Sequence, residues 1–240
     1  MTNKVNIGGV NIVACPSINE LIDNSILNSD GVIPGMAIAV NPEKIIAAKN
    51  DPDVMAILQN ATVCYPDGVG VSYVMSKRIG SKVARIPGCE LWERLMARSI
   101  EKKIPVYLLG ATQDTVEQTN DKLNLQGVNV VGFKNGYFSK EQQQSVIDEI
   151  VSSGAKIVSV ALGSPRQELF IFECMKQAPQ TFFMGVGGTY DVFTGNVKRA
   201  PKLFRVLNLE WLYRLSSQPS RLFRQSNLLK YIYFYLTNKV

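Results

Sequence analysis

Six short apolar runs alternate with segments of helical periodicity through the middle of the chain, and this alternation is the strongest constraint on its fold. The runs are apolar on both faces, as expected of strands in a parallel sheet that is covered on two sides. A helical segment separates most neighbouring runs, which is typical of parallel crossovers. We therefore predict an α/β, Rossmann-like fold with a mostly parallel sheet and helices on both faces. The predicted strands span residues 35–40, 61–65, 104–110, 128–133, 156–163 and 181–187.

The turns that follow two of these runs carry helix-start signals. Asn41-Pro42 supplies a capping residue followed by proline at the first helical position, and Ser164-Pro165 repeats this pattern with Gln167 at the place of a capping box. Both turns lie at carboxyl ends of strands, the edge where open α/β sheets bind ligands. The predicted helical segments span residues 42–59, 68–78, 88–102, 113–124, 139–153 and 165–177, and a small hairpin is predicted around Gly8-Gly9.

The positive charge of the chain is concentrated at its C-terminal end. Residues 196–240 contain nine lysines and arginines against the single acid Glu210, while the whole chain has a formal net charge of +6. We predict an α/β catalytic domain over residues 1–195 and a helical basic appendage over 196–240. Mixed aromatic and cationic residues suit either a helix at a membrane interface or an ordinary helix packed on the domain. The charge favours phosphates or an anionic lipid surface as the partner.

Composition excludes several kinds of chemistry. The chain has no histidine, so that mechanisms with a histidine base or a zinc-histidine site are excluded, and a carboxylate must accept any proton. Its four cysteines are far apart and indicate buried thiols. No basic start with an apolar stretch opens the chain, and no apolar run reaches the roughly 18 residues of a membrane span. We expect the chain to stay in the cytosol.

Two polar residues at strand ends are candidates for chemistry. Asp67 follows an apolar run and precedes a glycine-containing helix start, where its carboxylate could accept a proton from a hydroxyl. The pattern alone favours the simpler interpretation, a plain turn or helix-capping aspartate. Gln167 has the same ambiguity, because the capping box accounts for it fully.

Glycine-rich turns and an acidic pair give weaker signals. Residues 185–192, GVGGTYDV, and the turn at Gly110 offer unobstructed backbone N–H groups for a nucleotide, although neither is a GxGxxG motif. The chain has no GxxxxGK[ST], which argues against a P-loop ATPase. Asp51-Pro52-Asp53 resembles the metal-binding DxD of sugar-nucleotide enzymes, but its setting predicts a helix junction with Asp51 as the cap.

Several motifs occur together in one order: VNPEK, YPDGVGV, RIPGCELWERLM, ALGSPRQELF and the run MGVGGTYDVFTGNVKRAPKLFRVLNLEWLYRLSSQPSRLFRQ. In these motifs the chain resembles the WecG/TagA/CpsF glycosyltransferase family from about residue 33 onward. Within the family, the residues of these motifs are most similar to those of the branch that transfers N-acetylmannosaminuronic acid in enterobacterial common antigen synthesis. The teichoic acid branch, which transfers N-acetylmannosamine, is less similar.

The resemblance implies an inverting, metal-independent transfer from a UDP-sugar to undecaprenyl-diphosphate-N-acetylglucosamine, with no cofactor. The implied partners are the UDP-sugar donor, the lipid-diphosphate acceptor and the cytoplasmic face of the membrane, which the basic C-terminal tail would contact. No nucleic-acid partner is expected. The protein would then be associated peripherally with the inner face of the cytoplasmic membrane.

The resemblance also assigns roles to residues. Asp67 matches the motif aspartate and would be the base, Arg85 would bind substrate, and Gln167 matches the glutamine of GSPxQE. The remaining expected substrate-binding residues are Asn41, Gly110, Gly163, Gly185, Gly187 and Asp191, with Arg214, Arg221 and Arg224 placed by the appendage over the donor diphosphate.

One position departs from the family pattern. Some members have threonine two residues before the asparagine of the NPE motif, where this chain has Ala39. A hydroxyl contact there cannot be transferred, and the difference could mark another donor or acceptor sugar. Two alternatives stay open, a transferase of N-acetylmannosamine or another hexosamine and a noncatalytic scaffold that binds nucleotide-sugars.

Overall fold

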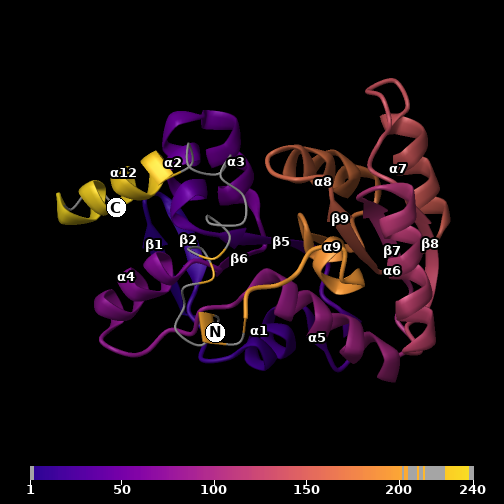
Figure 1. Ribbon diagram of the computed structural model, residues 1–240, viewed down its shortest axis with the longest axis horizontal. Coiled ribbons are helices and arrows are strands. Elements are labelled where there is room, and N and C mark those ends of the chain that lie inside the picture. The colour runs from indigo at the N-terminus through magenta and orange to yellow at the C-terminus, as the bar shows by residue number, and fades with distance from the viewer. Residues whose placement is uncertain (1–2, 202, 205–209, 211–212, 214–224, 238–240) are drawn as a thin grey trace.

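The computed structural model of the protein describes residues 3–201, 203–204, 210, 213 and 225–237. A six-stranded sheet forms its centre, with the strand order β6-β5-β10-β9-β7-β8 and parallel pairing throughout (Figure 1). The predicted α/β fold is therefore confirmed. The strands are β5 (Gly35–Val40), β6 (Val63–Pro66), β7 (Val106–Gly110), β8 (Val130–Lys134), β9 (Ile157–Ala161) and β10 (Phe182–Gly185).

Helices follow the strands as the sequence pattern predicts. Those before β7 are α1 (Ile18–Ser25), α2 (Pro42–Asn50), α3 (Pro52–Asn60), α4 (Val69–Ile79) and α5 (Gly88–Glu101). The later ones are α6 (Gln113–Leu125), α7 (Gln143–Ser152), α8 (Arg166–Gln177), α9 (Thr189–Thr194) and α12 (Gln225–Leu236). Short antiparallel pairs complete the description: β1 (Lys4–Ile7) with β2 (Val10–Val13), the hairpin expected around Gly8-Gly9, and β3 (Leu27–Asn28) with β4 (Gly31–Val32).

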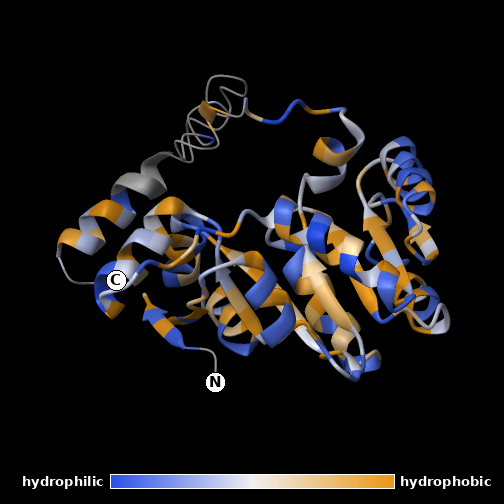
Figure 2. Ribbon diagram, turned by 90° about the horizontal axis from the view of Figure 1, so that it is seen from below, coloured by the Kyte–Doolittle hydropathy of each residue, from blue (hydrophilic) through white to orange (hydrophobic). Residues whose placement is uncertain are grey.

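Alternate side chains of the strands feed two separate cores, one on each face of the sheet. In β5, Met36 and Ile38 join the core beneath α2, α3, α4, α7 and α8, whereas Ala37 joins the core beneath α1, α5, α6 and α9. Apolar strands therefore lie between helices whose outer faces are polar (Figure 2). This arrangement explains why the strand segments read as apolar runs without alternation.

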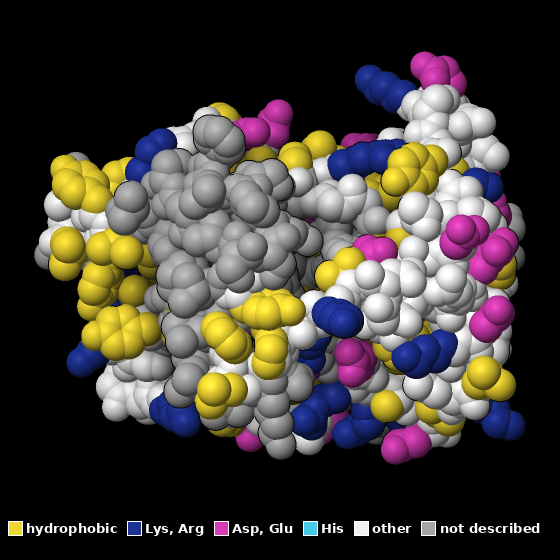
Figure 3. Space-filling model, in the orientation of Figure 1, with side chains coloured by type: hydrophobic (Ala, Val, Ile, Leu, Met, Phe, Trp, Pro, Cys, Tyr) yellow, Lys and Arg dark blue, Asp and Glu magenta, His cyan; other side chains and the backbone are white. Residues whose placement is uncertain are grey.

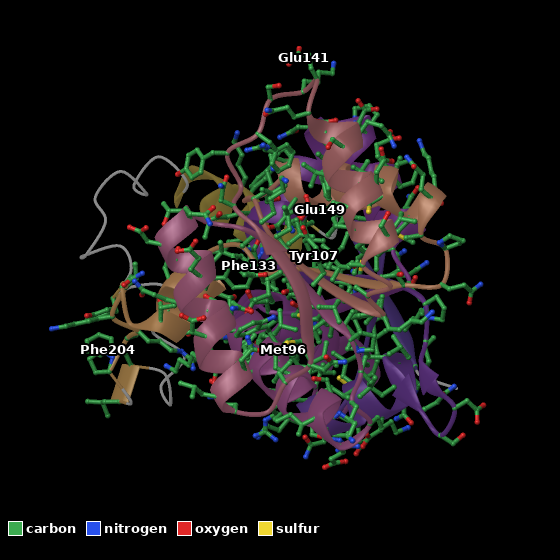
Figure 4. The ribbon with its side chains drawn as sticks, turned by 90° about the vertical axis from the view of Figure 1, so that its right-hand side faces the viewer. Met96, Tyr107, Phe133, Glu141, Glu149 and Phe204 are labelled. Carbon is green, nitrogen blue, oxygen red and sulfur yellow. The ribbon has the colours of Figure 1, made fainter. Side chains whose placement is uncertain are left out.

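At the β8 edge of the sheet, a tyrosine hydroxyl and an ion pair connect the strands to α7. The Tyr107 hydroxyl on β7 donates to Glu149 Oε1 on α7 at 2.5 Å (Figure 4), and Lys134 on β8 lies 2.6 Å from Glu149 Oε2. Gly132 on β8 leaves room for the Tyr107 ring, because a Cβ there would lie 2.6 Å from Tyr107 Cε2. Burial raises the pKa of the Tyr107 hydroxyl, which stays protonated.

Two helix starts test the capping predictions. Asp51 caps α3 as predicted, since its Oδ1 accepts from the backbone N–H of Asp53 at 2.9 Å and of Val54 at 3.3 Å. The prediction for α8 is wrong. Pro165 itself is the capping residue, the helix begins at Arg166, and no side chain caps it. The Gln167 amide side chain points elsewhere, which leaves it available for the site described below.

The C-terminal helix α12 packs against α2, the helix that follows β5 (Figure 1). Tyr231 is buried in this contact, and its hydroxyl lies 3.5 Å from the carbonyl oxygen of Gly70. No helix among residues 3–201 and 225–237 is long and apolar enough to cross a membrane. The division at residues 195 and 196 stays a prediction, because much of 196–240 lies outside the described residues.

Candidate active site

A cavity of about 820 Å³ opens at the carboxyl ends of β5, β6 and β10. Seven of the residues predicted from sequence line it, although they come from five different stretches of the chain. These are Asn41, Asp67, Arg85, Gln167, Gly185, Gly187 and Asp191. The lining also contains the first residues of α4 and α5 and the described residues Glu210, Tyr213 and Tyr231 from the C-terminal segment.

Asp67 stands directly after β6 and is held there by its own backbone. Its N–H donates to the carbonyl oxygen of Val40 at 3.0 Å, which ties the turn to the end of β5. Its Oδ1 accepts from the N–H of Gly88, the first residue of α5, at 3.3 Å. Gly68, and not Asp67, occupies the capping position of α4. The interpretation of Asp67 as a cap for the helix that follows it is therefore wrong.

Arg85 connects the Asp67 turn to the C-terminal segment. Its Nε donates to the backbone carbonyl oxygen of Asp67 at 2.7 Å, and its Nη2 lies 3.1 Å from Oε2 of Glu210. The Arg85 side chain is 19% exposed and the Glu210 side chain is 5% exposed, so the pair is largely shielded from water. A cation is thereby fixed next to the residue that the sequence marks as the base.

The Gln167 side chain is hydrogen-bonded to the glycine-rich turn of residues 185–192. Its Oε1 accepts from the N–H of Gly187 at 3.0 Å, and its Nε2 donates to Glu168 Oε1 at 3.1 Å. Gly185 permits this approach, because a Cβ there would lie 2.6 Å from Gln167 Nε2. The capping-box interpretation of Gln167 is wrong, since the amide bonds a turn 20 residues further along the chain.

A buried ion pair lies behind Gln167. Lys44 Nζ on α2 donates to Glu168 Oε1 at 2.7 Å, and the two side chains are 13% and 6% exposed. Burial raises the pKa of the Glu168 carboxyl, but the Lys44 ammonium and the Gln167 amide lower it by more, so that the net shift is downward. Glu168 therefore stays ionised and orients the Gln167 amide.

Asn41 caps α2 as the sequence predicts. Its Oδ1 accepts from the N–H of Lys44 at 2.8 Å, while its side chain also lines the cavity. Gly68 packs against this turn, since a Cβ there would lie 2.7 Å from Pro42 Cδ. The cap thus positions α2 and brings the Asn41 amide to the site.

Exchanging Asn41 separates these two contributions. Asn41→Ala should lower the free energy of unfolding by about 1 kcal/mol, because the cap is lost, whereas Asn41→Ser should retain most of it. If the amide also binds substrate, both variants should raise KM to the same degree. Urea denaturation and initial-rate kinetics measure the two effects, and an unchanged KM in both variants would leave Asn41 with the cap alone.

Of the glycine-rich turns predicted to bind substrate, only one lines the cavity. Gly185, Gly187 and Asp191 line it, and Asp191 on α9 also lies 3.5 Å from the Thr115 hydroxyl. Gly110 is the last residue of β7 and Gly163 lies in the turn after β9, and both are outside this lining. A structural cause accounts for Gly110, because a Cβ there would lie 2.4 Å from the carbonyl oxygen of Ala161. Arg214, Arg221 and Arg224 lie outside the described residues.

The cavity wall also contains Tyr65, Cys89, Arg199 and Glu210, none of which was predicted as a site residue. Tyr65 is fully buried, and burial raises the pKa of its hydroxyl well above the ordinary value. Glu210 had one available signal, as the single acid among the cations of 196–240. The contacts that bring these residues together span long sequence separations and leave no local pattern.

The four cysteines differ in their surroundings. Cys15, Cys64 and Cys174 are buried in the two cores, and burial raises the pKa of their thiols to about 11, 12 and 12 respectively. Cys89 is partly exposed and lines the cavity in the first turn of α5. The expectation of buried thiols is confirmed for the first three residues.

The fold and the cavity together define an α/β protein with a carboxylate, a buried amide and arginines at the ligand-binding edge of a parallel sheet. Over residues 5–240 the chain matches the model of the WecG/TagA/CpsF glycosyl transferase family, and it belongs to that family. It is therefore a glycosyltransferase of surface polysaccharide synthesis, with a nucleotide-sugar donor and a lipid-linked acceptor.

Proposed function

We propose that this glycosyltransferase transfers N-acetylmannosaminuronic acid from its UDP donor to undecaprenyl-diphosphate-N-acetylglucosamine, with inversion and without a metal ion. The observation that carries the proposal is the meeting of Asp67, Arg85 and Gln167 in one cavity of a chain that belongs to this family. The product would be a lipid-linked intermediate of a surface polysaccharide such as enterobacterial common antigen.

Asp67 acts as the general base in this proposal. It removes the proton of the acceptor hydroxyl while that oxygen attacks the anomeric carbon from the face opposite UDP. The bond between the anomeric carbon and the UDP oxygen breaks, and its electrons stay with the departing diphosphate. Since the chain contains no histidine, a carboxylate at this edge is the natural proton acceptor.

Cations around the cavity stabilise the charge that develops on UDP. Arg85, Lys198 and Arg199 line the cavity together with the first residues of α5 and the glycine-rich turn. Such preorganised groups typically supply a large share of the rate enhancement in a site that excludes water. The same cations support a uronate donor, whose additional carboxylate needs a positive or N–H-rich partner.

An apolar surface beside the cavity supports association with the cytoplasmic face of the membrane. Tyr73 on α4 and Ile232, Tyr233 and Leu236 on α12 are 45–74% exposed. Hydrophobic side chains gather at the end of the molecule where these two helices lie (Figure 3). Lys77 lies 5.8 Å from the centre of the Tyr73 ring. Aromatic and aliphatic side chains accompanied by cations are typical of helices at a lipid interface.

A UDP-release assay tests the reaction. Lipid-diphosphate-N-acetylglucosamine in vesicles is offered with UDP-N-acetylmannosaminuronic acid or UDP-N-acetylmannosamine, with chelator present throughout. Acceptor-dependent release from the uronate donor alone is expected. Release from the neutral donor alone would transfer the protein to the teichoic-acid type of reaction. Release that appears only when metal is added in excess of the chelator would contradict the metal-independent mechanism. No release from either donor would favour a noncatalytic role in nucleotide-sugar binding.

A further inference from the structure

Glu210 is the single acid of residues 196–240, and its carboxylate is placed between two arginines of the cavity wall. Its Oε2 lies 3.1 Å from Nη2 of Arg85, and its Oε1 lies 3.8 Å from Nε of Arg199. The Glu210 side chain is 5% exposed. One buried carboxylate is therefore shared by two guanidinium groups that come from separate parts of the chain.

Both guanidinium groups are also held by partners other than Glu210. Arg85 donates through Nε to the backbone carbonyl oxygen of Asp67 at 2.7 Å, and Arg199 donates through Nη2 to Glu90 Oε1 at 2.5 Å. These contacts fix both cations on the wall built by the Asp67 turn and the start of α5. The two arginines would consequently keep their positions if another anion replaced the Glu210 carboxylate.

The carboxylate fits this position incompletely. A separation of 3.8 Å between Arg199 Nε and Glu210 Oε1 is an ion pair and not a hydrogen bond. Among the described residues, Arg199 Nε is buried and has no hydrogen-bond acceptor. A buried donor without an acceptor is costly. A larger anion with more oxygens could bond both guanidinium groups at once, as arginines commonly do with phosphates.

We propose that Arg85 and Arg199 form a diphosphate-binding subsite and that the Glu210 carboxylate occupies it until a substrate diphosphate displaces it. The subsite adjoins Asp67, because Arg85 bonds the backbone of that residue. The ligand class is a diphosphate ester, which either the nucleotide donor or the lipid acceptor can provide. Which substrate supplies it rests on the proposed function, whereas the subsite itself can be tested by binding alone.

Calorimetric titration of the full chain with inorganic pyrophosphate, UDP, uridine and farnesyl diphosphate provides the test. Glu210→Gln removes the competing charge and nearly preserves the shape of the side chain. We expect it to bind pyrophosphate about tenfold more tightly than the wild type, since a charge-assisted contact no longer has to be broken. Uridine, which has no phosphate, should bind both proteins equally. A gain with UDP would assign the subsite to the donor, and a gain with farnesyl diphosphate would assign it to the acceptor.

Glu90→Gln is the matched control, because it removes the same charge from the other side of Arg199. It should bind pyrophosphate no more tightly than the wild type, since Arg199 loses its anchor. Adding Arg199→Gln to Glu210→Gln should abolish the gain. Unchanged or weaker binding by Glu210→Gln with a wild-type melting temperature would overturn the proposal, and so would an equal gain in Glu90→Gln.

A second variant that keeps the negative charge makes the test independent of whether Glu210→Gln folds. Glu210→Asp withdraws the carboxylate by one methylene and should also bind pyrophosphate more tightly, by a smaller factor than Glu210→Gln. Tighter pyrophosphate binding without transfer of any sugar would preserve the subsite and refute the proposed reaction. Sugar transfer by the wild type, without tighter pyrophosphate binding in these variants, would support the proposed reaction and refute the subsite.

Discussion

The Asp67→Asn variant should lose about 10² to 10⁴-fold in turnover while it still binds the UDP donor. Asparagine keeps Oδ1, which accepts from the N–H of Gly88, so the start of α5 and the wall of the cavity should stay in place. Only the ability to accept the acceptor proton is lost. Acceptor-dependent UDP release measures kcat, and calorimetric titration with UDP measures donor binding.

Asp191→Asn is the corresponding exchange at another carboxylate of the same cavity. Since Asp191 is proposed to bind substrate and not to accept a proton, its loss should raise KM far more than it lowers kcat. A near-normal kcat in Asp67→Asn would refute the proposed base. An equal loss of kcat in both variants would show that the effect comes from the charge of the cavity and not from proton transfer.

Lys44→Met should lower the free energy of unfolding by about 3–5 kcal/mol at pH 7, the typical cost of leaving a buried charge without its partner. Glu168 would keep its place beside Gln167 but lose the ammonium at 2.7 Å. Burial, which raises the pKa of its carboxyl, would then be opposed mainly by the Gln167 amide. Urea denaturation of the wild type and the variant measures the difference.

The pH dependence gives this prediction a sign. In the wild type the net pKa shift of Glu168 is downward, so the stability that it contributes is present above its unfolded pKa of about 4.3 and is lost as pH falls through the lower folded value. In Lys44→Met the carboxyl can protonate at higher pH, which relieves the buried charge. The deficit of the variant should therefore be smaller at pH 5 than at pH 7.

Lys176→Met provides the control for this exchange. Lys176 lies 2.7 Å from Glu173, but both side chains are about half exposed, at 56% and 47%. Exposed pairs of this kind typically contribute about 0 to 1 kcal/mol. A loss in Lys44→Met no greater than the loss in Lys176→Met would show that the buried pair contributes little. A deficit that stays constant with pH would show that the carboxyl does not protonate.

The fold was predictable because its signals are local. Strands covered on both faces are continuous apolar runs, and the caps at Asn41 and Asp51 lie within three residues of the N–H groups that they bond. The predicted boundaries differ from the observed ones by a few residues, as at β7, which begins at Val106 after Pro105 and not at residue 104. Proline has no N–H to donate to a neighbouring strand.

The site was less predictable, because its hydrogen bonds join distant residues. Asp67 reaches Gly88, and Gln167 reaches Gly187. A local pattern explains each of these side chains as a cap, and both explanations are wrong. The resemblance to a family placed both residues in the site, but it gave no indication of Arg199 or Glu210, whose contacts depend on how the C-terminal segment meets the cavity.

Because three cysteines are buried and Cys89 is partly exposed, the protein has one native position that a thiol reagent can label selectively. The thiolate is the form that alkylating reagents attack, and the raised pKa of Cys15, Cys64 and Cys174 keeps these buried thiols protonated at neutral pH. Cys89 is the partly exposed cysteine and lies on the cavity wall. Alkylation of the unmodified chain at neutral pH would therefore report on the cavity, and its rate in the presence of a nucleotide or a lipid would indicate whether the wall at α5 is covered.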